Sequence, residues 1–470
     1  MPTRPLLPLL LAVLAAAPVQ AQVRLVAIGT LSAQYEDLAH ATAPPLENGV
    51  PGNRLGGLGS GLAHAGGTTF LALPDRGPNA KPYNTGVDDT ASYLPRFHTL
   101  DLSLAPSDPG SPLPFMLTPS LRDTTLLSSS QPLVYGSGKA LGLPGGAPVL
   151  NSRHTFYFSG RSDNFDATRP STHPWNGRLD PEGIRVSRDG RSVFISDEYG
   201  PFLYQFDRHS GRRLRAFQLP AKFAVQNLSP KGDAEVSGNT AGRVANKGME
   251  GLAITPDGRI LVGAMQSPLL QDGGTSAPFI RLVAVNLRTG ATLEYAYELT
   301  NLGTASKPKY PTVSEILAIN DHEFLVDERD GKGLGDGSAA GYKRIYRIDL
   351  HGAPEVGNLA GAASLAGKAV AKSLFLDVVA ALGAQGLTPE QIPAKLEGLA
   401  FGQDVRVDGV LKHTLFLASD NDYTAVVTDN LHPAGAPNPN QFFVFAFSDD
   451  DLPGFAPQRI CGEEPDRGDD

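Results

Sequence analysis

A strand–turn–strand motif recurs along this chain and restricts the folds that the chain can adopt. Each copy joins a Gly-rich or Glu-Gly start, an apolar strand, a turn, a second apolar strand and acidic residues. Turn pairs such as Asp189-Gly190 and Asp257-Gly258 are those that tight hairpins demand. The repetition therefore predicts a chain built from β-hairpins. The copies begin at Ser60, Pro181, Met249, Ser314 and Leu396.

The spacing of the copies favours a β-propeller. Intervals of 68, 65 and 82 residues separate Glu182, Glu250, Glu315 and Glu397. A propeller blade of four short strands needs roughly 40 to 50 residues plus its loops. We expect an all-β propeller of about six blades with long inter-blade loops, in which the wide gap after Gly61 holds an additional blade or a long insertion. An irregular β-sandwich is the alternative, although sandwiches rarely repeat a motif at such intervals.

Two further segments complete the predicted architecture. Residues 23–35 and 441–447 are strand-like and could share one blade, which would close the ring. Residues 367–386 place apolar side chains at helical spacing and end at a glycine. We expect a helical insertion there, before the last blade, continued by a short helix capped by Thr388.

The first 21 residues read as a secretory signal peptide. A basic residue, an apolar run and a small-residue cleavage site after Ala21 follow one another. A membrane anchor is the alternative, but the run is short of a bilayer span. The predicted domains are a signal peptide at 1–21, one propeller at 22–460 and an acidic, disordered tail at 461–470. We therefore expect an extracellular or periplasmic protein, and a monomer.

Charge and cysteine content exclude several classes of protein. The formal net charge is −9, so no broad basic surface is available for nucleic acid. No later segment is apolar enough to cross a membrane. Cys461 is the single cysteine, which rules out an intrachain disulfide and a cysteine-based metal site.

The glutamates of the motif predict an acidic site at one mouth of the propeller channel. Glu182, Glu250 and Glu397 share one register, and Glu315 lies close to it. Ionised carboxylates gathered at one mouth would repel one another, and Ca²⁺, which prefers oxygen ligands, would relieve that repulsion. The alternative is that these acids only serve turns and loops. Further acids follow the second strands, namely Asp75, Asp197, Glu198, Asp327, Glu328, Asp420 and Asp422.

Basic residues accompany these acids and suggest a phosphorylated substrate. Arg76, Lys247 and Arg329 stand beside the motif copies. Guanidinium groups match phosphate oxygens, and a metal ion neutralises phosphate charge and activates water. The alternative is that each cation pairs with a neighbouring acid.

The motifs, taken together and in order, resemble the phytase-like family, also described as "esterase-like activity of phytase". The resemblance rests on "LPDRGPN", "LDPEGI", "SDEYGPFLYQFD", "NKGMEGLAITPDG", "DERDG", "KLEGLAF" and "LFLASDNDY". It implies a secreted β-propeller that hydrolyses phosphoric esters. Gln266 departs from the pattern, because other copies have an acid there, and Ser60 stands where a leading Glu is expected.

The family is also similar to calcium-dependent propeller phytases, whose acids hold Ca²⁺. That similarity implies the following metal ligands here: Glu182, Asp197, Glu198, Glu250, Asp327, Glu328, Glu397 and Asp420. The predicted catalytic set is Glu182, Asp197, Glu198, Arg76, Arg329 and Lys247.

The predicted function is a secreted phosphoric-ester hydrolase that uses Ca²⁺ to activate water on a small phosphorylated substrate. Two alternatives remain. One is a calcium-dependent lactonase or carboxylic esterase, which predicts few cations and a more apolar lining. The other is a non-catalytic extracellular binding protein with a structural metal. The fold alone cannot choose, since propellers host all three.

Overall fold

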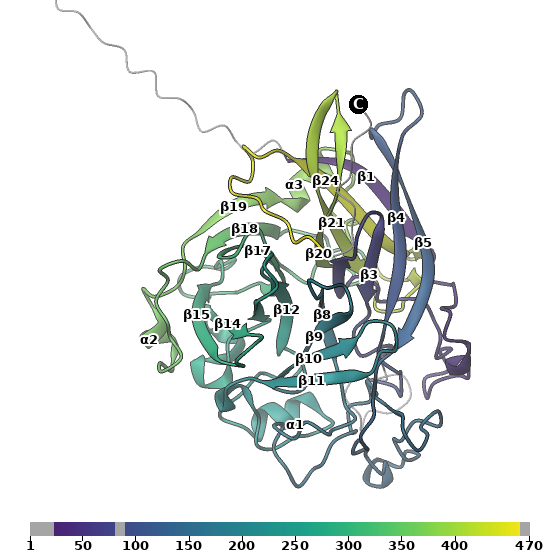
Figure 1. The fold of residues 1–470 in the computed structure, drawn as a ribbon, viewed down its shortest axis with the longest axis vertical. Coiled ribbons are helices and arrows are strands. Elements are labelled where there is room, and N and C mark those ends of the chain that lie inside the picture. The colour runs from purple at the N-terminus through teal and green to yellow at the C-terminus, as the bar shows by residue number, and fades with distance from the viewer. Residues whose placement is uncertain (1–22, 80–89, 461–470) are drawn as a thin grey trace, which may run out of the picture.

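Five four-stranded antiparallel sheets stand around a central axis in a β-propeller (Figure 1). This computed structural model describes residues 23–79 and 90–460. The predicted signal peptide and the predicted acidic tail lie outside the described residues. The predicted all-β propeller is confirmed.

Each sheet is one blade, and four blades follow the chain in order. They consist of β2 (Gly61–His64), β3 (Thr69–Leu73), β4 (Arg96–Pro106) and β5 (Phe115–Leu126); β8 (Pro181–Val186), β9 (Ser192–Asp197), β10 (Phe202–Asp207) and β11 (Arg213–Gln218); β12 (Met249–Ile254), β13 (Ile260–Met265), β14 (Phe279–Asn286) and β15 (Thr292–Glu298); and β16 (Thr312–Ala318), β17 (Glu323–Arg329), β18 (Lys343–Asp349) and β19 (Lys372–Asp377).

The fifth blade joins both ends of the described chain. Its strands are β20 (Lys395–Val407), β21 (Val410–Asp420), β24 (Asn440–Phe447) and β1 (Arg24–Leu31). The pairing runs from Leu31 opposite Asn440 to Arg24 opposite Ala446. The predicted sharing of one blade by the two terminal strands is therefore confirmed, and the ring closes without a covalent link.

The blade count is five rather than the expected six or so. The gap between the first two motif copies contains no extra blade among the described residues. It is filled by β4 and β5, which are 11 and 12 residues long, and by a long connection whose strands are the short β6 (Ser128–Ser129) and β7 (Phe156–Tyr157). Another two-stranded pair, β22 (Val426–Val427) and β23 (Ala436–Pro437), decorates the fifth blade's connection. Long connections, not a sixth blade, account for the wide spacing.

The predicted helical insertion is largely wrong. Residues 372–377 form β19, the outer strand of its blade, and only α3 (Val378–Gly383) is helical. Pairing with β18 overrides the local helical pattern, as tertiary contacts often do. Residues 388–391 form a turn instead of a capped helix. The other short helices are α1 (Gly232–Ser237) and α2 (Ala362–Leu365), with 3-10 turns at His40–Thr42, Lys139–Leu141, Ala221–Phe223, Leu270–Asp272 and Gly274–Ser276.

The glycine of the Glu-Gly motif lets neighbouring inner strands approach closely. The five inner strands β2, β8, β12, β16 and β20 contact one another in that order around the axis. A methyl group added to Gly183 would lie 2.7 Å from the backbone nitrogen of Leu252, and one added to Gly251 would lie 2.7 Å from that of Ile316. A side chain at either position would push two blades apart.

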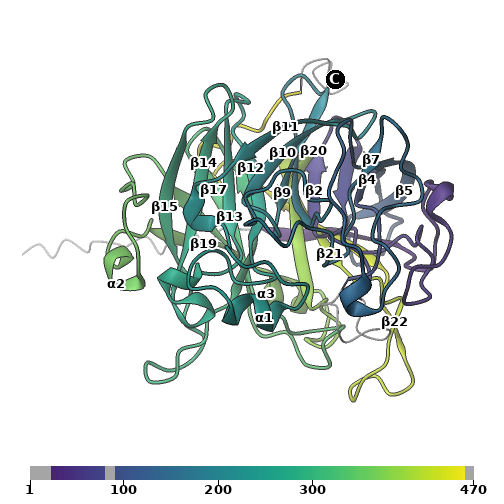
Figure 2. The ribbon, with the colours of Figure 1, turned by 90° about the horizontal axis from the view of Figure 1, so that it is seen from below.

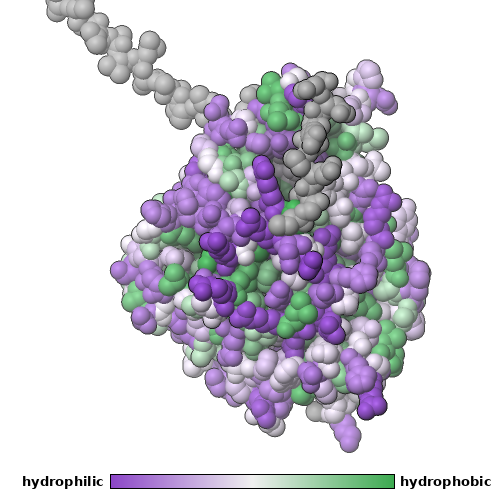
Figure 3. Space-filling view, in the orientation of Figure 1, coloured by the Kyte–Doolittle hydropathy of each residue, from purple (hydrophilic) through white to green (hydrophobic). Residues whose placement is uncertain are grey.

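The last described segment crosses the mouth at which the inner strands end. Ala456 donates to the carbonyl of Ile319, and Gln458 Nε2 donates to that of Val186 over 3.0 Å. This face is towards the viewer in Figure 1, and in Figure 3 a hollow near its middle shows apolar side chains surrounded by hydrophilic ones. Loops gather beyond both ends of the blades when the propeller is seen from the side (Figure 2). In the described part of the chain, no helix is long and apolar enough to span a membrane.

Candidate active site at the carboxylate mouth

β-bulges at the start of the inner strands aim one side chain per blade into the channel. The pairing of inner and second strands is interrupted at Glu182, Glu250 and Glu397. A bulge re-aims its side chain away from the ordinary alternation. All three glutamates line one cavity at the mouth where the inner strands begin, as their shared register predicts. We call this end of the channel the carboxylate mouth.

Glu315 lies one residue out of this register. In β16 the interruption falls at Ser314, and Glu315 pairs opposite Asp327, at the position that Gly251 has opposite Ala264. Ser314 is thus the counterpart of the three glutamates. Glu315 instead forms an ion pair with Arg185 at 3.0 Å and accepts a hydrogen bond from the amide of Leu252.

A second ring of side chains comes from the residues that end or follow the second strands. The strand pairing makes five positions equivalent, one in each blade, and all five line the cavity. This second ring consists of Asp75, Glu198, Gln266, Arg329 and Asp420.

Three residues of the predicted metal and catalytic sets do not line this cavity. Asp197 and Glu328 lie one position before the second ring, and Asp327 lies two positions before it, so each faces other surroundings. Asp197 accepts hydrogen bonds from the amides of Asp180, Tyr199 and Gly200. Two tyrosine hydroxyls and Lys372 donate to Glu328. Asp327 is buried beside Glu315.

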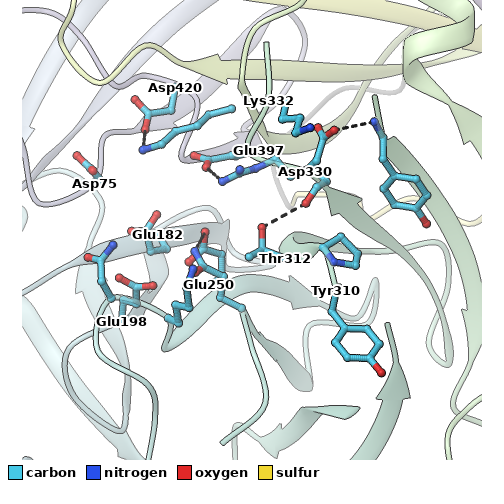
Figure 4. A pocket seen from close by; sticks show the side chains of 18 of the residues that line it. Asp75, Glu182, Glu198, Glu250, Tyr310, Thr312, Asp330, Lys332, Glu397 and Asp420 are labelled. Carbon is cyan, nitrogen blue, oxygen red and sulfur yellow. Dashed lines mark hydrogen bonds and ion pairs between the residues drawn. The ribbon is translucent and has the colours of Figure 1, made fainter. Parts of the chain in front are cut away.

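The cavity at the carboxylate mouth has a volume of about 740 Å³. Besides the three glutamates and the second ring, the cations Arg76, Lys247 and Lys395 line the cavity. The first two were predicted from the sequence. Figure 4 shows Glu182, Glu198 and Glu250 on one side, Asp75 and Asp420 on another, and Tyr310 and Lys332 at the far end. The remaining lining residues are Asn246, Leu302, Lys309, Pro311, Thr312, Asp330, Gly331, Gly341 and Tyr342.

Three of the six cations that line the cavity, Arg76, Arg329 and Lys395, are engaged by acids. Arg76 donates from Nη1 to Asp180 over 2.9 Å. Arg329 donates from Nη2 to Glu397 and from Nε to Ser314. Lys247 differs, because its Nζ donates to the neutral amide of Gln266 over 2.9 Å. No described acid forms a direct ion pair with Lys247.

Burial raises the pKa of the cavity's carboxyl groups. For Glu182 the largest cause is loss of water, followed by the charges of Glu250 and Asp180, and its pKa lies well above the usual value. Burial and Glu250 likewise raise the pKa of Glu198. Burial raises the pKa of Glu397 to about 7, although Arg329 opposes it. Ionised carboxylates here need cations.

Two carboxylate oxygens of the cavity have no donor among the described residues. Glu198 is 1% exposed and Glu250 is 3% exposed, yet Oε2 of each has no hydrogen-bond partner. The nearest cation of Glu198 is Arg76, whose Nη1 lies 3.9 Å from that oxygen. A buried carboxylate oxygen without a partner is costly, so these atoms point to a bound cation or proton.

Unusual backbone conformations also gather here. Four described non-glycine residues have positive φ angles. Asn246 lines the cavity, and Asp422 contacts the lining residue Lys395; Tyr423 follows directly. Strained backbone of this kind clusters at functional sites.

Sequence reasoning missed several members of the site. Asp180 is fully buried and shares a group with Glu182 and Glu198, and "LDPEG" already contained it. Lys395 stands two residues before Glu397 in "KLEGLA", but no cation recurs there in other copies. Lys309, Tyr310 and Lys332 come from loops, whose positions the motif does not encode.

Comparison with known proteins identifies one family. The sequence pattern described as "Phytase-like: Esterase-like activity of phytase" matches residues 53–423. A protein from Arthroderma benhamiae, described as an uncharacterized secreted protein, is 29% identical over 373 residues, which are 68% of this chain and 67% of that protein.

Solved propeller structures are similar only in a general way. The periplasmic gluconolactonase of Pseudomonas aeruginosa is 10% identical with a TM-score of 0.32, covering 91% of this chain and 100% of that one. The PQQ-bound aldose sugar dehydrogenase of Streptomyces coelicolor is 12% identical with a TM-score of 0.31, covering 92% and 100%. Similarity this low carries no argument about function.

Proposed function

The chain belongs to the phytase-like family, and from this premise we propose that it hydrolyses phosphoric esters in the cavity of the carboxylate mouth. One observation carries the proposal. Cationic side chains line the same cavity as carboxylates that have oxygens without a donor among the described residues, as hydrolysis of a phosphate ester with help from a metal ion requires.

The residues of the cavity fit Ca²⁺. Carboxylate oxygens are the ligands that Ca²⁺ prefers, and two in this cavity are buried without a donor from the described part of the chain. Glu182, Glu198 and Glu250 would hold the ion, with Asp180 beside them. Bound there, Ca²⁺ would neutralise phosphate charge and lower the pKa of a water molecule. Asp197, Asp327 and Glu328 are engaged elsewhere and are not part of this set.

The cations of the cavity would bind and orient the phosphate group. Arg76 and Arg329 each donate a hydrogen bond from the guanidinium to a carboxylate, which fixes the orientation of the side chain. Lys247 donates to the neutral amide of Gln266 and forms no direct ion pair with a described residue, so its charge is available to an anionic substrate. Burial lowers the pKa of Lys247, so binding of a phosphate would stabilise its ammonium form.

The lining argues against the lactonase alternative. Six cationic side chains line the cavity, namely Arg76, Lys247, Lys309, Arg329, Lys332 and Lys395. A neutral lactone gains little from these charges. Apolar side chains, among them Leu302, Tyr310 and Pro311, also line the cavity.

The deciding experiment is a substrate panel with purified protein. Phosphate or alcohol release is measured from 4-nitrophenyl phosphate, a phosphodiester, phytate, a carboxylic ester and a lactone, with Ca²⁺ or with a chelator. We expect turnover of a phosphate ester that requires Ca²⁺. Turnover that survives chelation would remove the metal from the mechanism. Turnover of the lactone alone would favour the lactonase, and turnover of none would leave a binding protein.

A further inference from the structure

Two groups of three carboxylates lie in or beside the cavity, and they differ in how their charge is balanced. One consists of Asp75, Asp420 and Asp422, and the other of Asp180, Glu182 and Glu198. In each group the acceptor oxygens lie within 4.8 Å of one another. Three ionised carboxylates that close need a cation between them.

In the first group, a lysine of the chain is that cation. Lys395 Nζ lies 2.9 Å from Asp420 Oδ2 and 2.5 Å from Asp422 Oδ1. Lys395 pairs directly opposite Asp420 in the β20–β21 ladder, so the strand register fixes its position. Two carboxylates within ion-pair distance of one ammonium group are enough to balance its charge.

In the second group, Arg76 is the one cation of the described residues within 4 Å, and it pairs closely only with Asp180. Arg76 satisfies Asp180 through its backbone amide, at 3.1 Å, and through Nη1, at 2.9 Å. It does not reach hydrogen-bond distance of Glu198, whose Oε2 has no donor among the described residues. Oε2 of the adjacent Glu250 is also without a donor, and both side chains are more than nine-tenths buried and face the cavity.

We infer that the cavity holds one divalent cation, on the side of Glu182, Glu198 and Glu250, and that the ammonium of Lys395 takes the place of a second. This inference rests on the metal-assisted function proposed above. Removal of the ammonium leaves Asp75, Asp420 and Asp422 as an open oxygen site, so a neutral side chain at position 395 creates a second site for a divalent cation.

The test is the stoichiometry of Ca²⁺ binding, measured by calorimetric titration of the full chain with CaCl₂ alone. We expect one ion for the wild type, two for Lys395→Met and one for Lys309→Met. Lys309 is a matched control, because it is an exposed lysine that lines the same cavity. Two ions or none in the wild type, or one ion in a folded Lys395→Met variant, would overturn the inference.

A second pair of variants keeps the inference testable if Lys395→Met does not fold. Glu198→Gln should lose Ca²⁺ binding, whereas Asp420→Asn should still bind one ion, because Asp420 belongs to the side that Lys395 neutralises. Loss of Ca²⁺ binding in Asp420→Asn, or retained binding in Glu198→Gln, would show that the ion does not lie beside Glu182, Glu198 and Glu250, and would overturn the inference. These titrations need no substrate. A wild type that binds one ion yet cleaves no ester refutes the proposed function alone, and one that cleaves phosphate esters but binds two ions refutes this inference alone.

Discussion

Arg185 Nη2 and Glu315 Oε2 lie 3.0 Å apart and connect two blades that are not neighbours in the ring. Arg185 also donates to the carbonyl oxygen of Leu62 at 2.7 Å and to that of Ile316 at 3.0 Å. One guanidinium thus links three blades near the axis, and it lines the cavity at the mouth opposite the carboxylates.

We therefore expect Arg185→Met to destabilise the propeller strongly. The change leaves the carboxylate of Glu315, which is fully buried, without its cation, and breaking such a pair costs about 3–5 kcal/mol. Denaturant unfolding measures the loss. The double variant Arg185→Met/Glu315→Gln should recover part of it, because no unpaired charge then remains. Equal stability of the single and double variants would show that the ion pair itself is not the cause.

Adjacent residues Asp197 and Glu198 should respond in opposite ways. Glu198→Gln removes a charge from the cavity, so we expect activity on a phosphate ester to fall at least about a hundredfold with little change in melting temperature. Asp197→Asn places an amide group against the N–H of Gly200 and should cost about 1–3 kcal/mol of stability. The measurements are initial rates and thermal unfolding for both variants. A Glu198→Gln enzyme with wild-type rates would exclude this residue from the site.

Asp327 should make the protein less stable as the pH rises. Burial raises its pKa to about 8 in the folded chain, against about 4 for a free aspartate. Between these values the folded state binds more protons than the unfolded state, so the free energy of unfolding falls as the pH rises from about 4 to about 8. Asp327→Asn should flatten this dependence and be more stable than the wild type at pH 8, by at least about 1 kcal/mol. The measurement is the unfolding midpoint of both proteins at pH 5 and pH 8. The same change in midpoint for both would show that Asp327 does not cause the pH dependence.

Gly251→Ala should destabilise the ring through backbone crowding. The added carbon would lie 2.7 Å from the nitrogen of Ile316 and 2.8 Å from the Cα of Glu315, and neither backbone atom can move alone. We expect a loss of about 2 kcal/mol or more, comparable to overpacking a core. Gly383→Ala is the control, since nothing lies within 4 Å of its added carbon. Similar melting temperatures for the two variants would mean that the blades have room to separate.

Much of the fold could be predicted from the repeated motif. Alternating apolar strands and Asp-Gly turns predicted the hairpins, and the shared register of Glu182, Glu250 and Glu397 predicted that they meet. Those features are local, or repeat once per blade. The closing pair of terminal strands could be predicted because each had an unpartnered strand pattern at its end of the chain.

The features that could not be predicted depend on single-residue shifts in strand pairing and on the positions of loops. A bulge placed one residue earlier puts Ser314 rather than Glu315 at the mouth, and no local pattern marks where a bulge will fall. Successive side chains of a strand point to opposite sides, so Glu198 lines the cavity and Asp197 does not, although both are carboxylates and adjacent in the sequence. Lys395 occurs in one blade only, so a search for repetition passes over it. The strand at 372–377 has a helical pattern and follows its partner β18 instead.

The blade that joins β1 to β24 also has a consequence for biosynthesis. The strand that leaves the ribosome first among those described pairs only with one of the last, more than 400 residues later, as in Leu31 opposite Asn440. Until that last strand emerges, β1 has no partner and the ring stays open at one edge. A chain cut short before β24 would keep most of its blades and still present a bare strand edge, which invites pairing with other chains. Synthesis must therefore be nearly complete before this protein is safe from aggregation.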